Sequence, residues 1–156
     1  MQPHIREALD PDHVVAAGWL QSEAAALPPG ALLQPIQILI AELQYRVQSE
    51  GGKSLVMILG EDPVALGQYS AVRPGEVHLC RLIVSPGLRR QGYGKALCGE
   101  LMAMAVAHTG ARFVTARVAR DHIAGRNLCS AFGFQAVTAE SDSKSLFLRR
   151  MHRPGR

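Results

Sequence analysis

The chain has 156 residues, almost half of them apolar, and a formal net charge of +4 from 17 basic and 13 acidic side chains. This length is typical of one domain, and the apolar fraction is enough for one hydrophobic core. No apolar run approaches the roughly 18 residues of a membrane-spanning helix, and the N-terminus lacks the apolar stretch of a signal peptide. We therefore expect one domain over residues 1–156 that does not enter a membrane.

The cysteines and the basic residues indicate which metals, partners and location to expect for this protein. Cys80, Cys98 and Cys129 lie far apart, and no pair has metal-ligand spacing. We therefore expect reduced thiols, no metal and a cytoplasmic location. Basic residues cluster in three places, but aromatic residues are only 5% of the chain and no reading-helix motif occurs. We therefore expect no nucleic-acid partner.

The first half of the chain predicts one strand, two helices and three further strands. A strand over His4–Leu9 precedes a helix that begins at Asp10 as N-cap and Pro11 as first helical residue. A second helix is expected over Pro35–Gln48. The three strands that follow are Lys53–Leu59, Val64–Val72 and Val77–Val84. Turn signals separate these strands, which predicts an antiparallel meander.

The second half alternates helices and strands. A long helix over Gly92–Thr109 has an apolar stripe and ends at Gly110. The remaining elements are the strand Phe113–Val118, the helix Ile123–Phe132 capped by Gly133, and the strands Phe134–Thr138 and Leu146–Arg149. This order predicts a single α/β (α+β) domain, with a mixed sheet of about seven strands and four flanking helices. Residues 150–156 are expected to form a flexible tail.

A glycine-rich loop joins the third strand of the meander to the long helix. It reads Arg89-Arg90-Gln91-Gly92-Tyr93-Gly94-Lys95. The first turn of a helix has unpaired N–H groups and a positive dipole end, so it can bind phosphate, and the basic side chains would add contacts. Bulky Leu97 excludes the dinucleotide fingerprint, and no Gly-Lys-Ser/Thr follows for a Walker loop. On its own the loop is also compatible with a glycine-rich turn bearing solvated arginines.

The neighbouring residues make the assignment more specific. The loop resembles motif A of the GCN5-related N-acetyltransferase (GNAT) superfamily, Arg/Gln-x-x-Gly-x-Gly/Ala, with Arg89, Gly92 and Gly94 at its fixed positions. The preceding Leu82-Ile83-Val84-x-Pro86 resembles the end of that family's strand. Residues 128–134 resemble the end of its motif B, a helix followed by Gly-Phe. The resemblance covers residues 77–134, and elsewhere the order of elements agrees with the family.

The resemblance implies a V-shaped cleft between the strands Val77–Val84 and Phe113–Val118, with acetyl-CoA lying in it. Implied contacts to the pantetheine arm come from the backbone of Leu82, Ile83 and Val84. Implied contacts to the pyrophosphate come from Arg89, Arg90, Gln91, Gly92, Tyr93, Gly94 and Lys95. An amine would attack the thioester directly, without a covalent acyl-enzyme. The implied partners are therefore acetyl-CoA and an amine acceptor, and a homodimer is common in the family.

Motif B departs from the family at three positions. The family's Asn, Ala and Tyr fall on His122, Gly125 and Cys129. His122 would hydrogen-bond to pantetheine or contact phosphate, with Gly125 beside it; the alternative is an exposed His122 next to a capping Asp121. Cys129 would replace the tyrosine that protonates the leaving thiolate, since an ordinary thiol pKa is about 8.5. The alternative is a small residue packed near the cofactor, with water supplying the proton.

The chain also departs from the family at the position of the residue that accepts the amine proton. In one branch of the family a Glu lies four positions before the residue equivalent to Leu82, and this position is His78. A histidine with its ordinary pKa of about 6.5 suits the role, and Glu76, acting through water, is the second candidate. Other members use a Glu where this chain has Arg117, which cannot be a base. The alternative is that His78 has no catalytic duty.

The acceptor pocket is less defined by sequence. Candidates to line it, together with the loop Leu27–Leu33, are Trp19, Glu23, Tyr45, Tyr69 and His78. Of these, Trp19 and Tyr45 are of the type more often found in a core. Because the family's tyrosine and carboxylate are missing, a catalytically silent acyl-CoA-binding sensor or partner module is the main alternative to an enzyme. A nucleic-acid-binding protein, marked by strongly salt-dependent affinity, is a weaker one.

Overall fold

A computed structural model describes residues 2–24 and 35–152. Its seven-stranded sheet has the order β1-β2-β3-β4-β5-β7-β6. The strands are β1 (His4–Glu7), β2 (Lys53–Leu59), β3 (Asp62–Ser70), β4 (Glu76–Val84), β5 (Phe113–Ala119), β6 (Gln135–Ala136) and β7 (Ser145–Met151). All pairs are antiparallel except β4 with β5. The predicted mixed sheet and its meander are confirmed.

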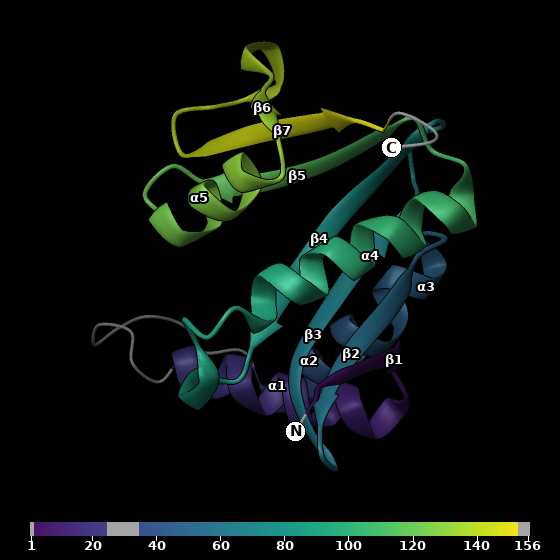
Figure 1. Cartoon of the computed structure of the whole chain (residues 1–156), viewed down its shortest axis with the longest axis vertical. Helices are drawn as coiled ribbons and strands as arrows, with labels where there is room; N and C mark the ends of the chain where they lie inside the picture. Colours follow the sequence, from purple (N-terminus) through teal and green to yellow (C-terminus); the bar gives the residue numbers. More distant parts are fainter. Residues whose placement is uncertain (1, 25–34, 153–156) are drawn as a thin grey trace.

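Helices cover both faces of the sheet (Figure 1). They are α1 (Asp10–Ala24), α2 (Ile36–Ala41), a π-helical turn (Glu42–Arg46), α3 (Val47–Ser49), α4 (Tyr93–Thr109) and α5 (Ile123–Ala131). Short 3₁₀ turns occur at Pro86–Leu88 and Thr138–Glu140. The long helix α4 lies across one face, whereas α1 and α2 lie against the other (Figure 1).

Each face of the sheet has its own group of buried side chains. On the α4 face, Leu97 and Leu101 pack with Val77 and Val114. On the opposite face, side chains of α1 and α2 pack with Leu66 and Ile83. Burial of these apolar surfaces is the main force that presses the helices onto the sheet. Because α4 is held along its length, its N-terminus has a fixed position beside the end of β4.

The parallel pair β4–β5 separates part-way along the sheet. Within the described residues, pairing extends only from Glu76 opposite Phe113 to Leu79 opposite Ala116. Both strands continue past that point, β4 to Val84 and β5 to Ala119. Beyond Leu79, β4 is therefore paired with β3 on one side and has no strand partner on the other. This divergence produces the V-shaped opening expected from the resemblance.

Two predicted helix details need correction. The N-cap of α1 is Leu9 rather than Asp10, because the carboxylate of Asp12 reaches back and accepts from the Leu9 N–H at 2.7 Å. The Arg6 guanidinium also pairs with this carboxylate, with 2.7 Å between Nη1 of Arg6 and Oδ2 of Asp12. The predicted helix over Pro35–Gln48 is interrupted by the π-helical turn. There the side chain of Gln68 in β3 donates to the Leu43 carbonyl at 2.6 Å, so this turn is bonded directly to the sheet.

The chain end is ordered further than expected. Arg150 and Met151 are the last residues of β7, and the His152 N–H donates to the Arg112 carbonyl at 2.7 Å. Of the predicted tail over residues 150–156, Arg150 and Met151 instead belong to β7 and His152 is bonded to Arg112, while 153–156 lie outside the described residues. The strand expected at Phe134–Thr138 shortens to β6, because a 3₁₀ turn begins at Thr138.

Candidate active site

The loop before α4 has the backbone conformation of an anion site. Gly92 is the N-cap of α4 at φ 86°, in the left-handed region, and no side chain caps the helix. Arg90 also has a positive φ, of 63°. Left-handed conformations cost a non-glycine residue about 1–2 kcal/mol, so the loop is held in shape despite a local cost at Arg90. The first N–H groups of α4 are thereby presented to solvent, where an anion can reach them.

Gly94 brings the first turn of α4 close to β4. A Cβ added at Gly94 would lie 3.3 Å from Cγ2 of Val84 and 3.9 Å from Cδ2 of Leu82. Glycine is therefore required at the two motif positions for different physical reasons. Gly92 supplies a left-handed conformation in open space, whereas Gly94 allows close packing of helix on strand. The result is an N-terminus of α4 directly beside the unpaired edge of β4.

The polar side chains of the loop surround this N-terminus. Arg89, Arg90, Gln91 and Lys95 are exposed, while Tyr93 is half-buried against the core. Three cations at the positive end of a helix create a local potential that attracts a polyanion. The predicted loop residues are therefore grouped around the first turn of α4, and their contact with a pyrophosphate stays a prediction.

A β-bulge in β4 separates this half of the site from the other. Gln68 of β3 pairs with Arg81, but the next residue, Tyr69, pairs with Leu79, so Cys80 is the extra residue. The bulge changes which side chains face α4: Val77 and Leu79 before it, Leu82 and Val84 after it. Consequently His78 and Ile83 share the opposite face, which is the face of α1 and α2.

His122 and Gly125 form a helix cap at the start of α5. His122 is the N-cap, and its Nδ1 accepts from the Gly125 N–H at 3.1 Å. A Cβ on Gly125 would lie 2.3 Å from that nitrogen, so glycine is needed for the imidazole to fit. The cap is His122 and not Asp121, whereas the exposure of His122 agrees with that alternative. Since Nδ1 is occupied, only Nε2 is left for a pantetheine or phosphate contact.

Cys129 is packed against the core, which disfavours a role as the general acid. It is a half-buried residue of α5 that contacts the core under α4. Burial raises the pKa of its thiol above the ordinary range. A thiol with a raised pKa is a weaker acid, so transfer of its proton to a leaving thiolate becomes less favourable. The packing interpretation is therefore favoured over the acid role.

His78 lies next to the point where β4 and β5 separate. Its Nδ1 is 2.8 Å from Oγ1 of Thr115, its neighbour on β5. The Thr115 hydroxyl in turn donates to the Val77 carbonyl at 3.4 Å. A Thr115 hydroxyl that donates its one hydrogen to Val77 can only accept from Nδ1, and on this basis we assign the hydrogen to Nδ1 and the lone pair to Nε2. Burial lowers the pKa of His78, and the charges of Arg117 and Arg73 lower it further, with partial opposition from Glu50 and Glu76.

Two neighbouring hollows meet at His78. One has a volume of about 310 Å³ and is lined by Glu50, Ser70, Val72, Arg73, Glu76, His78, Thr115, Arg117 and Phe147. The other, of about 190 Å³, is lined by Glu42, Val47, Glu50, Gln68, Ser70, His78, Cys80 and Arg81. Both contain His78, Ser70 and Glu50. The second candidate base, Glu76, lines only the larger hollow, where its carboxylate is 3.9 Å from the Arg73 guanidinium.

Glu50 and Ser70 were missed by sequence reasoning. Glu50 follows α3, and its carbonyl accepts from the Ala71 N–H at 2.9 Å. This contact requires Gly52, since a Cβ there would lie 1.7 Å from the Tyr69 carbonyl oxygen. Gly51-Gly52 marked only the end of a helix in the sequence. A close approach of the chain to β3 is a second reason for glycine at this point.

The residues predicted to line the acceptor pocket lie in different environments in the structure. Trp19 packs in the second core group, as its type suggested. Tyr45 is 60% exposed, so the expectation of a core residue is wrong. Tyr69 is fully buried on the α4 face and its hydroxyl contacts Nδ1 of His108, so it cannot line an acceptor pocket. The side chain of Glu23 and the loop Leu27–Leu33 lie outside the described residues.

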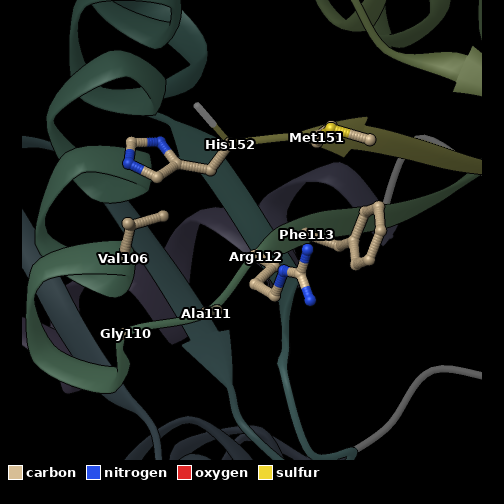
Figure 2. A pocket seen from close by; sticks show the side chains of 7 residues that line it. All are labelled: Val106, Gly110, Ala111, Arg112, Phe113, Met151 and His152. Atoms are coloured by element: carbon tan, nitrogen blue, oxygen red, sulfur yellow. The ribbon is translucent and has the colours of Figure 1, made fainter. Parts of the chain in front are cut away.

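A third hollow, of about 470 Å³, lies at the start of β5. Figure 2 shows Val106 and His152 beside α4, with Phe113 and Met151 on the neighbouring strands. Arg112, Gly110 and Ala111 complete its lining. Its wall contains none of the carboxylates or loop glycines described above. The hollow at His78 is therefore the better candidate for chemistry, although it is smaller.

Within the described residues, no group of three or more His, Cys, Asp or Glu side chains is arranged to hold a metal ion. None of the helices in that part of the chain has the length and apolar character needed to cross a membrane.

Comparisons with known proteins connect this geometry to a family. A model of the acetyltransferase (GNAT) family matches residues 19–134. A search of curated protein sequences found no match. Among solved structures, a ribosomal-protein-alanine N-acetyltransferase from Brucella melitensis is 18% identical with a TM-score of 0.75. That match covers 96% of this chain and 99% of the other.

Two similar structures are complexes with coenzyme A or acetyl-CoA. The PaiA N-acetyltransferase from Thermoplasma acidophilum, in complex with coenzyme A, is 16% identical with a TM-score of 0.74, covering 97% of this chain and 100% of that one. A phosphinothricin acetyltransferase from Sinorhizobium meliloti, in complex with acetyl-CoA, is 19% identical with a TM-score of 0.76. That match covers 97% of this chain and 89% of the other. At these identities the likeness establishes the fold, and it confirms the fold class expected from the sequence.

Proposed function

The chain belongs to the acetyltransferase (GNAT) family, and from that premise we propose that it is an acetyl-CoA-dependent N-acetyltransferase. It transfers the acetyl group directly to a primary amine. One observation carries the proposal: β4 and β5 separate after Leu79 beside the uncapped N-terminus of α4, and His78 lies at the point of separation. A cofactor half and a chemical half therefore meet along a single strand.

The residues of the cofactor half fit coenzyme A. The first N–H groups of α4 suit a pyrophosphate, and Arg89, Arg90 and Lys95 supply positive charge around them. The free edge of β4 over Leu82–Val84 suits the pantetheine amides, which can pair with it as a strand would. Gln91, Gly92, Tyr93 and Gly94 complete the cradle, and His122 Nε2 with Gly125 borders it from α5. Acetyl-CoA supplies the activated acyl group as a thioester.

His78 is the proposed proton acceptor. An amine is mostly protonated at neutral pH and must lose a proton before it can attack. Because Nδ1 is anchored on Thr115, the lone pair is on Nε2. Burial and the nearby Arg117 and Arg73 lower the pKa of His78, so that its neutral, accepting form dominates at neutral pH. Glu76 and Glu50 are the carboxylates of the same hollow that can attract the cationic amine.

The leaving thiolate takes its proton from solvent in this proposal. The raised pKa of Cys129 disfavours the thiol as donor. A cytoplasmic location is proposed on the basis of the free cysteines Cys80, Cys98 and Cys129. A homodimer, common in the family, is an expectation from the resemblance alone.

The test is a thiol-release assay with acetyl-CoA against a broad amine library, run beside calorimetric titration with acetyl-CoA. Release that depends on an added amine, together with binding, is the expected result. Binding without release for every amine would instead favour the alternative of a silent acyl-CoA-binding sensor or partner module. That alternative is kept because the tyrosine of motif B is a cysteine here and its thiol is a weakened acid.

A further inference from the structure

The larger hollow at His78 contains two guanidinium groups, Arg73 and Arg117, whose only role in the proposed reaction is to lower the pKa of His78. We propose that Arg73 and Arg117 form an anion subsite, and that the acceptor is a small amine carrying an acidic group, as an amino acid does. This inference rests on the proposed function and adds the substrate class to it.

The two arginines converge on one aromatic ring. The Arg117 guanidinium carbon lies 5.3 Å from the centroid of the Phe147 ring, and that of Arg73 lies 5.8 Å from it. The His78 imidazole stacks parallel to the same ring, with centroids 6.2 Å apart. Arg73 comes from the turn before β4, Arg117 from β5 and Phe147 from β7. Three separate parts of the fold thus bring two cations to the wall that also holds the proposed base.

Other contacts fix the guanidinium groups without using all their hydrogens. Arg73 pairs with the Glu140 carboxylate at 2.7 Å. Arg117 donates to Oγ of Ser145 at 2.8 Å and to the Glu140 carbonyl at 3.0 Å, and it lies 3.7 Å from the Asp142 carboxylate. A guanidinium has five N–H donors, so donors are left over on both side chains. Side chains that are already immobilised lose less entropy when they bind a ligand.

The charges that line the hollow match a ligand with both signs. Arg73 and Arg117 provide two positive charges, and Glu50 and Glu76 provide two negative ones. A zwitterion can place its ammonium toward a carboxylate and its acid toward the guanidinium groups. A diamine or polyamine would instead meet two cations with no negative group to offer them. The lining therefore favours an acceptor that contains an acid.

The size of the hollow favours a free small molecule. Its volume of about 310 Å³ is at the lower end of the range of ligand pockets, about 300–1,000 Å³. In a peptide the carboxyl group next to the terminal amine is an amide, which has no charge for an arginine to bind. We therefore take the acceptor to be a free amino acid or a molecule of similar size with the same two groups.

The decisive experiment compares amino acids with their own primary amides as acceptors in the thiol-release assay. Each pair shares the side chain and differs in one negative charge and in the pKa of the amine, so kcat/KM is compared per concentration of unprotonated amine. We expect the acids to have the higher kcat/KM. Arg73→Gln and Arg117→Gln should lower kcat/KM for the acids by about 10- to 100-fold, the effect of losing a hydrogen bond to a charged group, and change it little for the amides. The assay is run at pH 8, where His78 is neutral in every variant.

Arg149→Gln is the matched control. The Arg149 guanidinium also lies over a phenyl ring, 4.8 Å from the centroid of Phe113, and it is exposed on β7 outside the lining of the hollow. This variant removes the same charge and the same kind of ring contact. We expect no change in the preference for acids. An equal loss in Arg149→Gln would mean that net charge, not a subsite, sets the preference, and would overturn the proposal.

A binding arm tests the subsite without turnover. In the presence of coenzyme A, calorimetry compares an N-acetyl amino acid with its N-acetyl amide. Tighter binding of the acid that is lost in Arg73→Gln supports the subsite even if no amine gives thiol release, an outcome that would contradict the proposed function alone. Equal turnover and equal binding of acids and amides would overturn the subsite and leave the proposed function standing. A preference for peptides with a free N-terminus over free amino acids would also overturn it.

Discussion

The two halves of the candidate site are built from different parts of the polypeptide. The cofactor half is made by the backbone: a left-handed Gly92, a close helix–strand contact at Gly94, and the free edge of β4. The acceptor half is made by side chains, among them His78, Arg117 and Phe147, which come from three strands. Backbone sites restrict residue type strongly, whereas side-chain sites can be filled in many ways.

This difference explains which half can be identified from a family pattern. A left-handed N-cap and a helix that touches a strand both call for glycine, so any chain with this half carries a similar short motif. A proton acceptor needs only a lone pair and a suitable pKa, and here a histidine stands where one branch of the family has a carboxylate. In β4 the proposed base His78 and the proposed cofactor edge Leu82–Val84 lie on opposite sides of the bulge.

The largest effect is expected from His78→Gln. Glutamine can keep a hydrogen bond to Thr115 but cannot accept a proton at neutral pH, and loss of a general base typically costs about 10²–10⁴ in rate. The turnover number should fall by that amount, while the affinity for acetyl-CoA measured by calorimetry stays at the wild-type value. A large loss of acetyl-CoA affinity would show that the two halves are not separate.

The pH profile of the wild-type protein is the control for this assignment. Because burial, Arg117 and Arg73 lower the pKa of His78, the neutral base persists to lower pH than for an ordinary histidine. The acidic limb of kcat/KM should therefore lie below about pH 6.5, with activity falling only as the pH drops through the lowered pKa. In His78→Gln this limb should disappear. A limb that is unchanged in the variant would assign it to another group, with Glu76 as the next candidate.

A smaller effect, confined to the other half, is expected from Gly92→Ala. Alanine at φ 86° costs about 1–2 kcal/mol, and relief of this strain would move the N–H groups at the start of α4. The dissociation constant for acetyl-CoA should rise about 5- to 30-fold, with turnover at saturation little changed. Gly87→Ala is the matched control, since Gly87 lies nearby, has no positive φ and has open space around its Cα. Equal losses in both variants would contradict the conformational explanation.

The smallest effect is expected from Cys129→Ala. A packed thiol with a raised pKa contributes little to protonation of the leaving group, so turnover should stay within about threefold of wild type. Its loss from the core contact should instead lower the melting temperature slightly, because buried apolar volume is removed. Turnover that falls tenfold or more with an unchanged melting temperature would show that Cys129 is the acid.

Much of the fold followed from local signals in the sequence. The strand Lys53–Leu59 was predicted with its observed bounds because an apolar run lies between glycine-containing turns. Gly110 caps α4 with a positive φ, as predicted. The C-cap of α5 is Phe132 rather than the predicted Gly133, which follows it with a positive φ. The π-helical turn was not predictable in this way. Its contact with the sheet comes from Gln68, 25 residues after Leu43, which donates to the Leu43 carbonyl.

The acceptor half could be predicted only in part. His78 was found through its register with Leu82, which is a local relation along one strand. Glu50, Ser70 and Phe147 were missed because they reach the hollow through pairings between distant segments. No local pattern marks them, and the sequence shows Gly52 only as a helix end although it also permits the close approach to β3.

The single extra residue in β4 has a consequence for how this protein can diversify. Since Cys80 shifts the strand by one position, His78 and the residues beyond the bulge belong to two separately phased stretches of one strand. His78 lies before the bulge and the proposed cofactor edge Leu82–Val84 lies after it, whereas Arg81 between them lines the smaller hollow with His78. A substitution at His78 therefore leaves the phase of Leu82–Val84 unchanged, because the bulge and not His78 sets that phase.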